Sequence, residues 1–122
     1  MQIDREILMQ AYKLVSEFLD AVNRSDTDLL KSKFNISSAV YDEIIECLKG
    51  YFGDANIKIS PPPLDTILEN SHRLLFELSS DNDCLEIECL LYNNNIISEP
   101  IAHFYLLKDN NKFKLEYQYI GS

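Results

Sequence analysis

Apolar residues in the first half of the chain recur with the spacing of an α-helix. Between Asp4 and Asn23 the apolar side chains fall on one side of a helical projection, while polar side chains lie mostly opposite. The apolar members are Ile7, Ala11, Leu14, Val15, Phe18, Leu19 and Val22. The pattern therefore predicts one long amphipathic helix that buries a single face.

Two further helices are predicted between this helix and residue 53. The first is short and includes Leu29, Leu30 and Phe34, and the second continues to Phe52. Small polar residues favour helix N-termini, and glycine favours the position after a C-terminus. The candidate N-caps are Ser25, Asp26, Ser37 and Ser38, and the candidate terminators are Gly50 and Gly53.

The second half of the chain changes to the alternation of β-strands. Side chains in a strand point to opposite faces in turn, so one face of each segment is apolar. Short connections rich in Asn and Asp separate the segments, which indicates tight turns and an antiparallel meander. The predicted strands are Arg73–Ser79, Cys84–Tyr92, Pro100–Leu107 and Lys112–Ile120.

The segment between the two halves predicts little regular structure. Asn56–Ser60 is a short extended run that stops at three prolines, and Leu64–Asn70 fits a turn of helix. Helices followed by strands define an α+β fold. We therefore expect one domain over residues 1–122, with N-terminal helices packed on one face of a curved four- to five-stranded antiparallel sheet.

The charge of the chain narrows the range of partners. Twenty acidic against eleven basic residues give a net charge of −9 and a pI near 4.5. Such a polyanion repels nucleic acid and anionic lipid, and it attracts basic proteins. No apolar run is long enough for a bilayer, the N-terminus has no apolar signal core, and the three cysteines form no CxxC pair. These features predict a cytoplasmic protein that binds neither membrane nor nucleic acid.

The segment FLDAVNRSDTDLLKSKF, from Phe18 to Phe34, resembles the opening of nuclear transport factor 2-like (cystatin-like) domains. The matching residues are Phe18, Ala21, Asp26, Leu29, Leu30 and Phe34. In that superfamily a long first helix ends in a polar turn, a short helix ends in an aromatic residue, and a curved antiparallel sheet follows. The resemblance implies this fold and allows several functions, among them isomerases, cyclases, ligand-binding domains and immunity proteins of bacterial toxin systems.

A proton-transfer enzyme is one function that the residues allow. His103 and Tyr105 share one face of their predicted strand, and Tyr117 shares a face with Tyr119 on the next. If the two faces coincide, a histidine base and a tyrosine donor line a pocket between sheet and helices. No carboxylate lies in register with His103 on its own strand, so we assign no catalytic residue and keep His103, Tyr105 and Tyr117 as an alternative pocket.

Metal and cofactor sites find no support in the sequence. His72 and His103 are not spaced as a ligand pair, and two neighbouring carboxylates are too few for a transition metal. The chain has three glycines and no phosphate-binding loop. We predict neither a metal site nor a cofactor.

The outward face of the predicted sheet is the stronger candidate site. In the stretch CLEIECLLY, from Cys84 to Tyr92, one face is wholly apolar and the other carries two carboxylates, a leucine and a tyrosine. Carboxylates around an apolar and aromatic centre suit recognition of a basic protein. The predicted partner-binding residues are Glu77, Glu86, Glu88, Leu90, Tyr92 and Glu116.

Among the functions that the resemblance allows, a small acidic domain without a catalytic constellation looks like an immunity protein, which would bind and neutralise a cognate bacterial toxin domain of the contact-dependent inhibition type. A nuclease toxin would be basic where it binds the phosphates of its nucleic-acid substrate. An acidic inhibitor can occlude that site by stoichiometric binding. The alternatives are a solvated sheet face, a homodimer interface, or a small-molecule isomerase, cyclase or ligand-binding domain.

Overall fold

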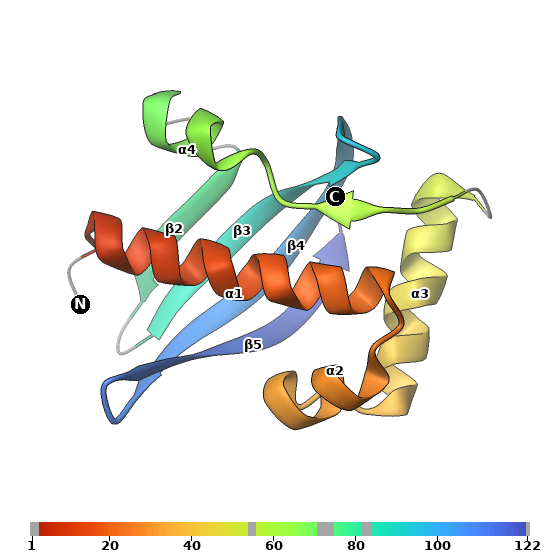
Figure 1. Cartoon of the computed structure of the whole chain (residues 1–122), viewed down its shortest axis with the longest axis horizontal. Coiled ribbons are helices and arrows are strands. Elements are labelled where there is room, and N and C mark those ends of the chain that lie inside the picture. The colour runs from red at the N-terminus through yellow and green to blue at the C-terminus, as the bar shows by residue number, and fades with distance from the viewer. Residues whose placement is uncertain (1–2, 54–55, 71–74, 82–83, 122) are drawn as a thin grey trace.

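The protein has an α+β fold in which helices cover one face of an antiparallel sheet (Figure 1). A computed structural model describes residues 3–53, 56–70, 75–81 and 84–121. The helices are α1 (Arg5–Asn23), α2 (Thr27–Phe34), α3 (Ser38–Phe52) and α4 (Leu64–Asn70), and the strands are β1 (Ile59–Ser60), β2 (Phe76–Asp81), β3 (Cys84–Asn93), β4 (Ile96–Asp109) and β5 (Lys112–Gly121). The expected fold class is confirmed, and the ambiguous segment at Leu64–Asn70 is a helix.

Side-chain caps set the starts of the first three helices. The carboxylates of Asp4 and Asp26 and the hydroxyl of Ser37 each accept a hydrogen bond from a backbone N–H three residues further on. At the end of α3, Gly53 has φ 75° and ψ −163°, a conformation that is essentially restricted to glycine. Gly50, the other candidate terminator, lies inside α3.

The sheet is antiparallel throughout, with the order β1-β3-β4-β5 and with β2 on the same edge of β3 as β1. The β4–β5 hairpin turns at Asn110 and Asn111, and the β3–β4 hairpin turns at Asn94 and Asn95. All four asparagines have positive φ, as the two-residue turns of β-hairpins require. The predicted turn at residues 80–83 and the start of the predicted strand at Arg73 fall partly outside the described residues.

The hydrophobic core lies between α1 and the sheet. α1 crosses the sheet diagonally and buries Val15, Phe18 and Leu19 completely. From the sheet, Leu85, Ile87 and Cys89 of β3 and Phe104 of β4 meet this layer, each with 1% exposure or less. Burying these side chains is the main source of stability, since apolar area removed from water is the dominant favourable contribution to folding.

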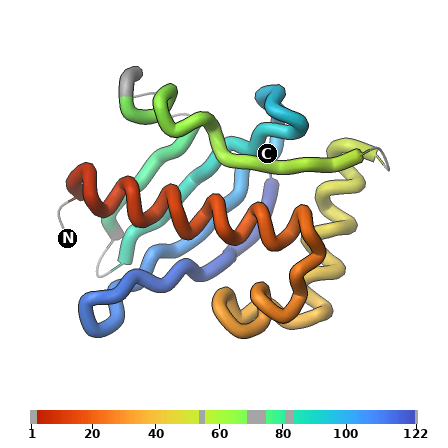
Figure 2. The backbone as a smooth tube through the Cα atoms, viewed as in Figure 1, coloured from red at the N-terminus to blue at the C-terminus, as the bar shows by residue number. Residues whose placement is uncertain are grey.

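The chain between α3 and α4 returns alongside α1, as the tube view shows (Figure 2). Asn23 anchors it, because its side-chain amide donates to the carbonyl of Ile59 at 2.7 Å and accepts from the N–H of Ile59 at 2.9 Å. Further along, the Tyr12 hydroxyl donates to the carbonyl of Pro62 at 2.8 Å. The three prolines therefore run against the first helix. None of the described helices is both long enough and apolar enough to span a bilayer.

Candidate functional site

The acidic candidate residues lie on the sheet face turned away from α1. Along β3, Leu85, Ile87, Cys89 and Leu91 are buried, whereas Glu86, Glu88, Leu90 and Tyr92 are exposed or half-buried. The predicted division of CLEIECLLY into an inner and an outer row is therefore confirmed. We call the side that carries Glu86 and Glu88 the outer face.

Two rows of side chains cross the outer face at right angles to the strands. The first row joins four strands, since Glu77 lies opposite Glu88, Glu88 opposite His103, and His103 opposite Tyr119. Side chains directly opposite each other have Cβ atoms about 4.5–5.5 Å apart, so these groups are neighbours. The second row has the order Ser79, Glu86, Tyr105 and Glu116.

A β-bulge at Gln118 creates the end of the first row. His103 pairs with Tyr119 whereas Phe104 pairs with Tyr117, so Gln118 is an extra residue on β5. The bulge reverses the alternation, and Tyr117 faces the core while Tyr119 lies on the outer face with 56% of its surface exposed. The expectation that Tyr117 and Tyr119 share one face was wrong, because the strand was assumed to be regular.

The alternative pocket of His103, Tyr105 and Tyr117 does not form. Tyr117 lies on the inner face, where its ring stacks on Phe18 at 5.5 Å between centroids and meets Phe104 edge-on at 6.0 Å. His103 and Tyr105 lie on the outer face, across the sheet from Tyr117. The inner space at Tyr117 is thus filled by aromatic side chains.

Burial alters the acidity of the groups on the inner side. It raises the pKa of Tyr117 to about 12, with a further contribution from nearby Cys47 and Glu43. Burial also raises the pKa of the Cys89 and Cys47 thiols. Raised thiol pKa values disfavour the thiolate, so neither cysteine has the environment of a reactive nucleophile.

A shallow pocket lies between the two rows of the outer face. Its volume is about 200 Å³. Glu86 and Glu88 come from β3, His103 and Tyr105 from β4, and the other lining residues are Ile87, Phe104, Gln118 and Tyr119. The rings of His103 and Tyr119 stack with centroids 4.1 Å apart and planes 12° apart. Carboxylates and aromatic rings thus border one small depression.

The outer-face carboxylates of Glu77, Glu86, Glu88 and Glu116 form no ion pair within the described part of the chain, although Lys114 shares their face, two residues from Glu116 on β5. Glu77 and Glu88 are directly opposite, an arrangement that destabilises a sheet when both are ionised. The ion pairs among the described residues all involve helix residues or the turn after α1, and they join Arg24 to Asp20, Arg24 to Asp26, and Lys33 to Glu17. The acidic rows therefore hold negative charge that an external cation can neutralise.

An apolar region borders the acidic rows toward the β3–β4 turn. Leu90 lies opposite Ile101, and its N–H donates to the carbonyl of Leu75. Tyr92 lies opposite Ile97, which is 54% exposed. Leu90 and Tyr92 thus lie next to apolar neighbours that the sequence pattern did not identify, because a register shift between Leu90 and Tyr92 places Ile97 there.

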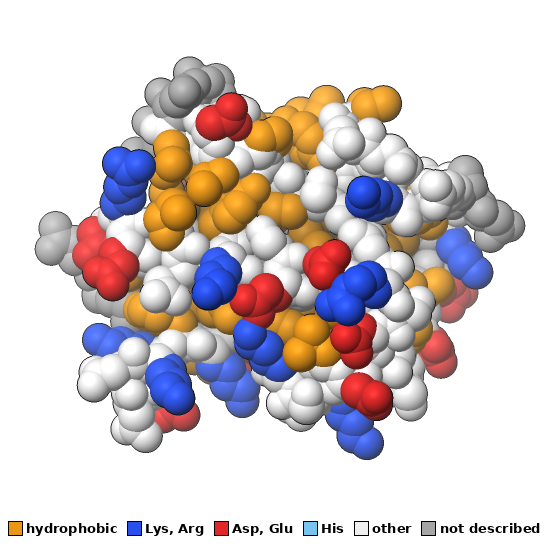
Figure 3. Space-filling view, viewed as in Figure 1, with side chains coloured by type: hydrophobic (Ala, Val, Ile, Leu, Met, Phe, Trp, Pro, Cys, Tyr) orange, Lys and Arg blue, Asp and Glu red, His pale blue; other side chains and the backbone are white. Residues whose placement is uncertain are grey.

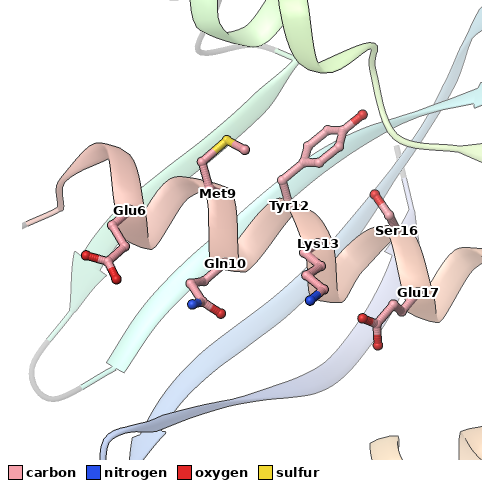
Figure 4. Close-up of a pocket in the computed structure, with 7 residues that line it drawn as sticks. All are labelled: Glu6, Met9, Gln10, Tyr12, Lys13, Ser16 and Glu17. Atoms are coloured by element: carbon pink, nitrogen blue, oxygen red, sulfur yellow. The ribbon is translucent and has the colours of Figure 1, made fainter.

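The helix side of the molecule has a different surface. A groove of about 570 Å³ runs along α1 and is lined by Glu6, Met9, Gln10, Tyr12, Lys13, Ser16 and Glu17. Met9, Tyr12 and Ser16 point to one side of α1, and the charged residues and Gln10 point to the other (Figure 4). Hydrophobic side chains gather between α1 and α4, while acidic and basic side chains alternate along α1 (Figure 3). This mixed surface lacks the excess of one charge that marks the outer face.

Among the described residues, no group of three or more His, Cys, Asp or Glu side chains is arranged to hold a metal ion. Comparison with known proteins gives no assignment either: no protein-family model matches the chain, and no curated protein or solved structure matches it significantly. The function must therefore be argued from the outer face itself.

Proposed function

We propose that the protein is an immunity protein of the nuclear transport factor 2-like class, which neutralises a bacterial toxin domain by covering its basic surface. The proposed partner is a nuclease toxin of the contact-dependent inhibition type, and the proposed compartment is the cytoplasm. The observation that carries the proposal is the outer face, where Glu77, Glu86, Glu88 and Glu116 lie in two adjacent rows and form no ion pair among the described residues.

The arrangement suits protein recognition better than chemistry. A basic toxin surface approaching the outer face would meet carboxylates first, which raises the rate of encounter. The neighbouring Leu90, Tyr92 and Ile97 offer an apolar area for burial, and buried aromatic anchors supply much of the energy of an interface. The carboxylates would bind the basic side chains of the toxin that otherwise bind the phosphates of its substrate. Inhibition by occlusion needs no catalytic residue.

The proposal also accounts for an unfavourable feature of the sheet. Like charges directly opposite each other, such as Glu77 and Glu88, cost stability in the free protein. A basic partner removes this repulsion on binding. The separation of His103 and Tyr105 from Tyr117 weighs against the alternative of an enzyme with a pocket inside the sheet.

The test is the association kinetics of the protein with a purified toxin domain encoded by a neighbouring gene. The double variant Glu86→Lys with Glu88→Lys should lower the association rate by about tenfold or more at low salt. The matched control, Asp42→Lys with Glu46→Lys on α3, changes the net charge equally at two exposed positions that do not belong to the outer face. Equal effects of the two double variants, or no effect of either, would exclude the outer face as the binding surface.

A further inference from the structure

The pocket on the outer face has the composition of a receptor for one cationic side chain. Its rim carries two carboxylates, Glu86 and Glu88, two residues apart on β3. Across the pocket from them lie the rings of Tyr105 and Tyr119 and the imidazole of His103. Aromatic faces attract cations, and carboxylates attract them more strongly, so the two kinds of group favour the same ligand.

The shape of the pocket favours a planar cation over a spherical one. The floor is the strand backbone at Ile87 and Phe104, and the walls are side chains that stand up from three adjacent strands. The stacked pair of His103 and Tyr119 forms one flat wall, with planes only 12° from parallel. A guanidinium group can stack on such a wall and still donate hydrogen bonds to carboxylates from its edge, which an ammonium group cannot do.

The bulge at Gln118 is what completes this wall. If Gln118 instead paired with His103 in a regular strand, Tyr119 would face the core and His103 would have no ring beside it. Bulges commonly re-aim a side chain near a functional site. The pocket therefore depends on side chains from three strands and on the bulge in β5. The alternation of residues within any one strand does not predict it.

We propose that this pocket receives an arginine side chain of the partner protein, with the guanidinium stacked on the face of His103 that Tyr119 leaves free and hydrogen-bonded to Glu86 and Glu88. The proposal deepens the proposed function and rests on it for the identity of the partner. The arginine supplies the central anchor of the interface, and the surrounding carboxylates serve the longer-range attraction. Binding forms no covalent bond and needs no cofactor.

The probe for this pocket is argininamide, with lysinamide at the same ionic strength as the matched cation. Titration of the full chain, followed by nuclear magnetic resonance, should shift the ring signals of His103 and Tyr119 with argininamide at millimolar concentration. Lysinamide should bind at least about threefold more weakly, because its ammonium group cannot stack and form two hydrogen bonds at once.

Four variants separate the pocket from the general charge of the outer face. Glu88→Gln should weaken argininamide binding by about threefold or more. Tyr119→Leu should do the same, because His103 loses the ring that orients it, and Tyr119→Phe should retain binding because that ring remains. The control is Glu77→Gln, which removes the same charge directly opposite Glu88 but does not line the pocket. It should change the affinity much less than Glu88→Gln.

Equal binding of argininamide and lysinamide would overturn the proposal, as would equal losses from Glu88→Gln and Glu77→Gln. Its failure can be told apart from failure of the proposed function. If argininamide does not bind selectively but reversal of Glu86 and Glu88 still slows toxin association, only the arginine pocket is wrong. If argininamide binds selectively and the toxin does not associate, the arginine pocket is supported and the proposed toxin partner is wrong.

Discussion

The imidazole of His103 and the phenol ring of Tyr119 stack on the outer face of the sheet, 4.1 Å apart between centroids. Strict alternation along β5 would have placed Tyr119 beside Tyr117 in the core. The stack exists because Gln118 is an extra residue that reverses the alternation between these two tyrosines. A single inserted position thus decides whether Tyr119 joins His103 on the outer face.

Deleting Gln118 should remove the bulge and keep the stack. Tyr117 and Tyr119 would become consecutive residues opposite Phe104 and His103, so Tyr119 would stay outward and Ile120, only 8% exposed in the intact protein, would stay inward. Exposing a buried isoleucine costs about 1.5–3 kcal/mol. Urea unfolding of the deletion variant should therefore show a loss smaller than this.

The control for this deletion is Gln118→Ala, which keeps the bulge and removes only an exposed hydrogen bond to Glu116. It should change the free energy of unfolding by less than about 0.5 kcal/mol. A deletion variant less stable than Gln118→Ala by about 1.5–3 kcal/mol would show that Ile120 becomes exposed and that the strand pairing beside the bulge is not kept.

Removing one of the two opposed carboxylates should stabilise the free protein. Glu77→Gln and Glu88→Gln each relieve the repulsion between directly opposite like charges, for a gain of a few tenths of a kcal/mol. The double variant should gain less than the sum, since the same repulsion is lost only once. Thermal unfolding at low and high salt checks this, and gains that persist unchanged in high salt would point to a cause other than charge.

Replacing an aromatic residue of the core by alanine should cost far more stability than replacing one on the outer face. Phe18 is fully buried and contacts Phe34, Phe104 and Tyr117, with centroids 5.3–5.5 Å apart. Phe18→Ala should cost about 3–5 kcal/mol, because it removes apolar burial and leaves a cavity.

The matched ring on the outer face is Tyr119, and Tyr119→Ala should cost less than about 1 kcal/mol, since the ring is more than half exposed. Chemical denaturation of the two variants gives the comparison. A similar loss for both would mean that the outer face is covered in the free protein, for example by a second copy, and the sedimentation velocity of the wild type would then reveal a dimer.

Most of the fold follows from local patterns in the sequence. The period of apolar residues predicts α1, and the caps at Asp26 and Ser37 place the starts of α2 and α3. The Asn-rich connections predict the hairpins, because asparagine tolerates the positive φ seen at all four turn residues that the structure describes. These features depend on a few neighbouring residues, which is why sequence alone reveals them.

The site is harder to predict because it depends on register between strands. Glu86 and Glu88 could be placed outward from alternation within one strand, but their neighbours His103 and Tyr119 come from two others. A two-residue turn at Asn110 and Asn111 fixes the pairing only as far as the bulge. Nothing in the residue types at 117–119 signals an inserted position, so the reversal of Tyr119 could not be inferred.

The pKa of Tyr117 predicts how stability depends on alkaline pH. The phenol titrates near 10.0 when unfolded and at about 12 in the folded protein, mainly because it is partly buried. Between these pH values the unfolded state loses its proton first, so rising pH favours unfolding. The contribution of Tyr117 to stability is therefore complete below pH 10 and is lost as pH rises toward 12.

The variant Tyr117→Phe isolates this effect, because it keeps the ring stacked on Phe18 and removes the titrating hydroxyl. Buried Cys89 and half-buried Cys47 and Tyr12 also have raised pKa values, so both proteins should lose stability in alkali. The wild type should lose more than the variant above pH 10, as measured by urea unfolding at a series of pH values. Parallel curves for the two proteins would mean that the Tyr117 phenol titrates with the same pKa in the folded and unfolded states, and that its hydroxyl reaches solvent.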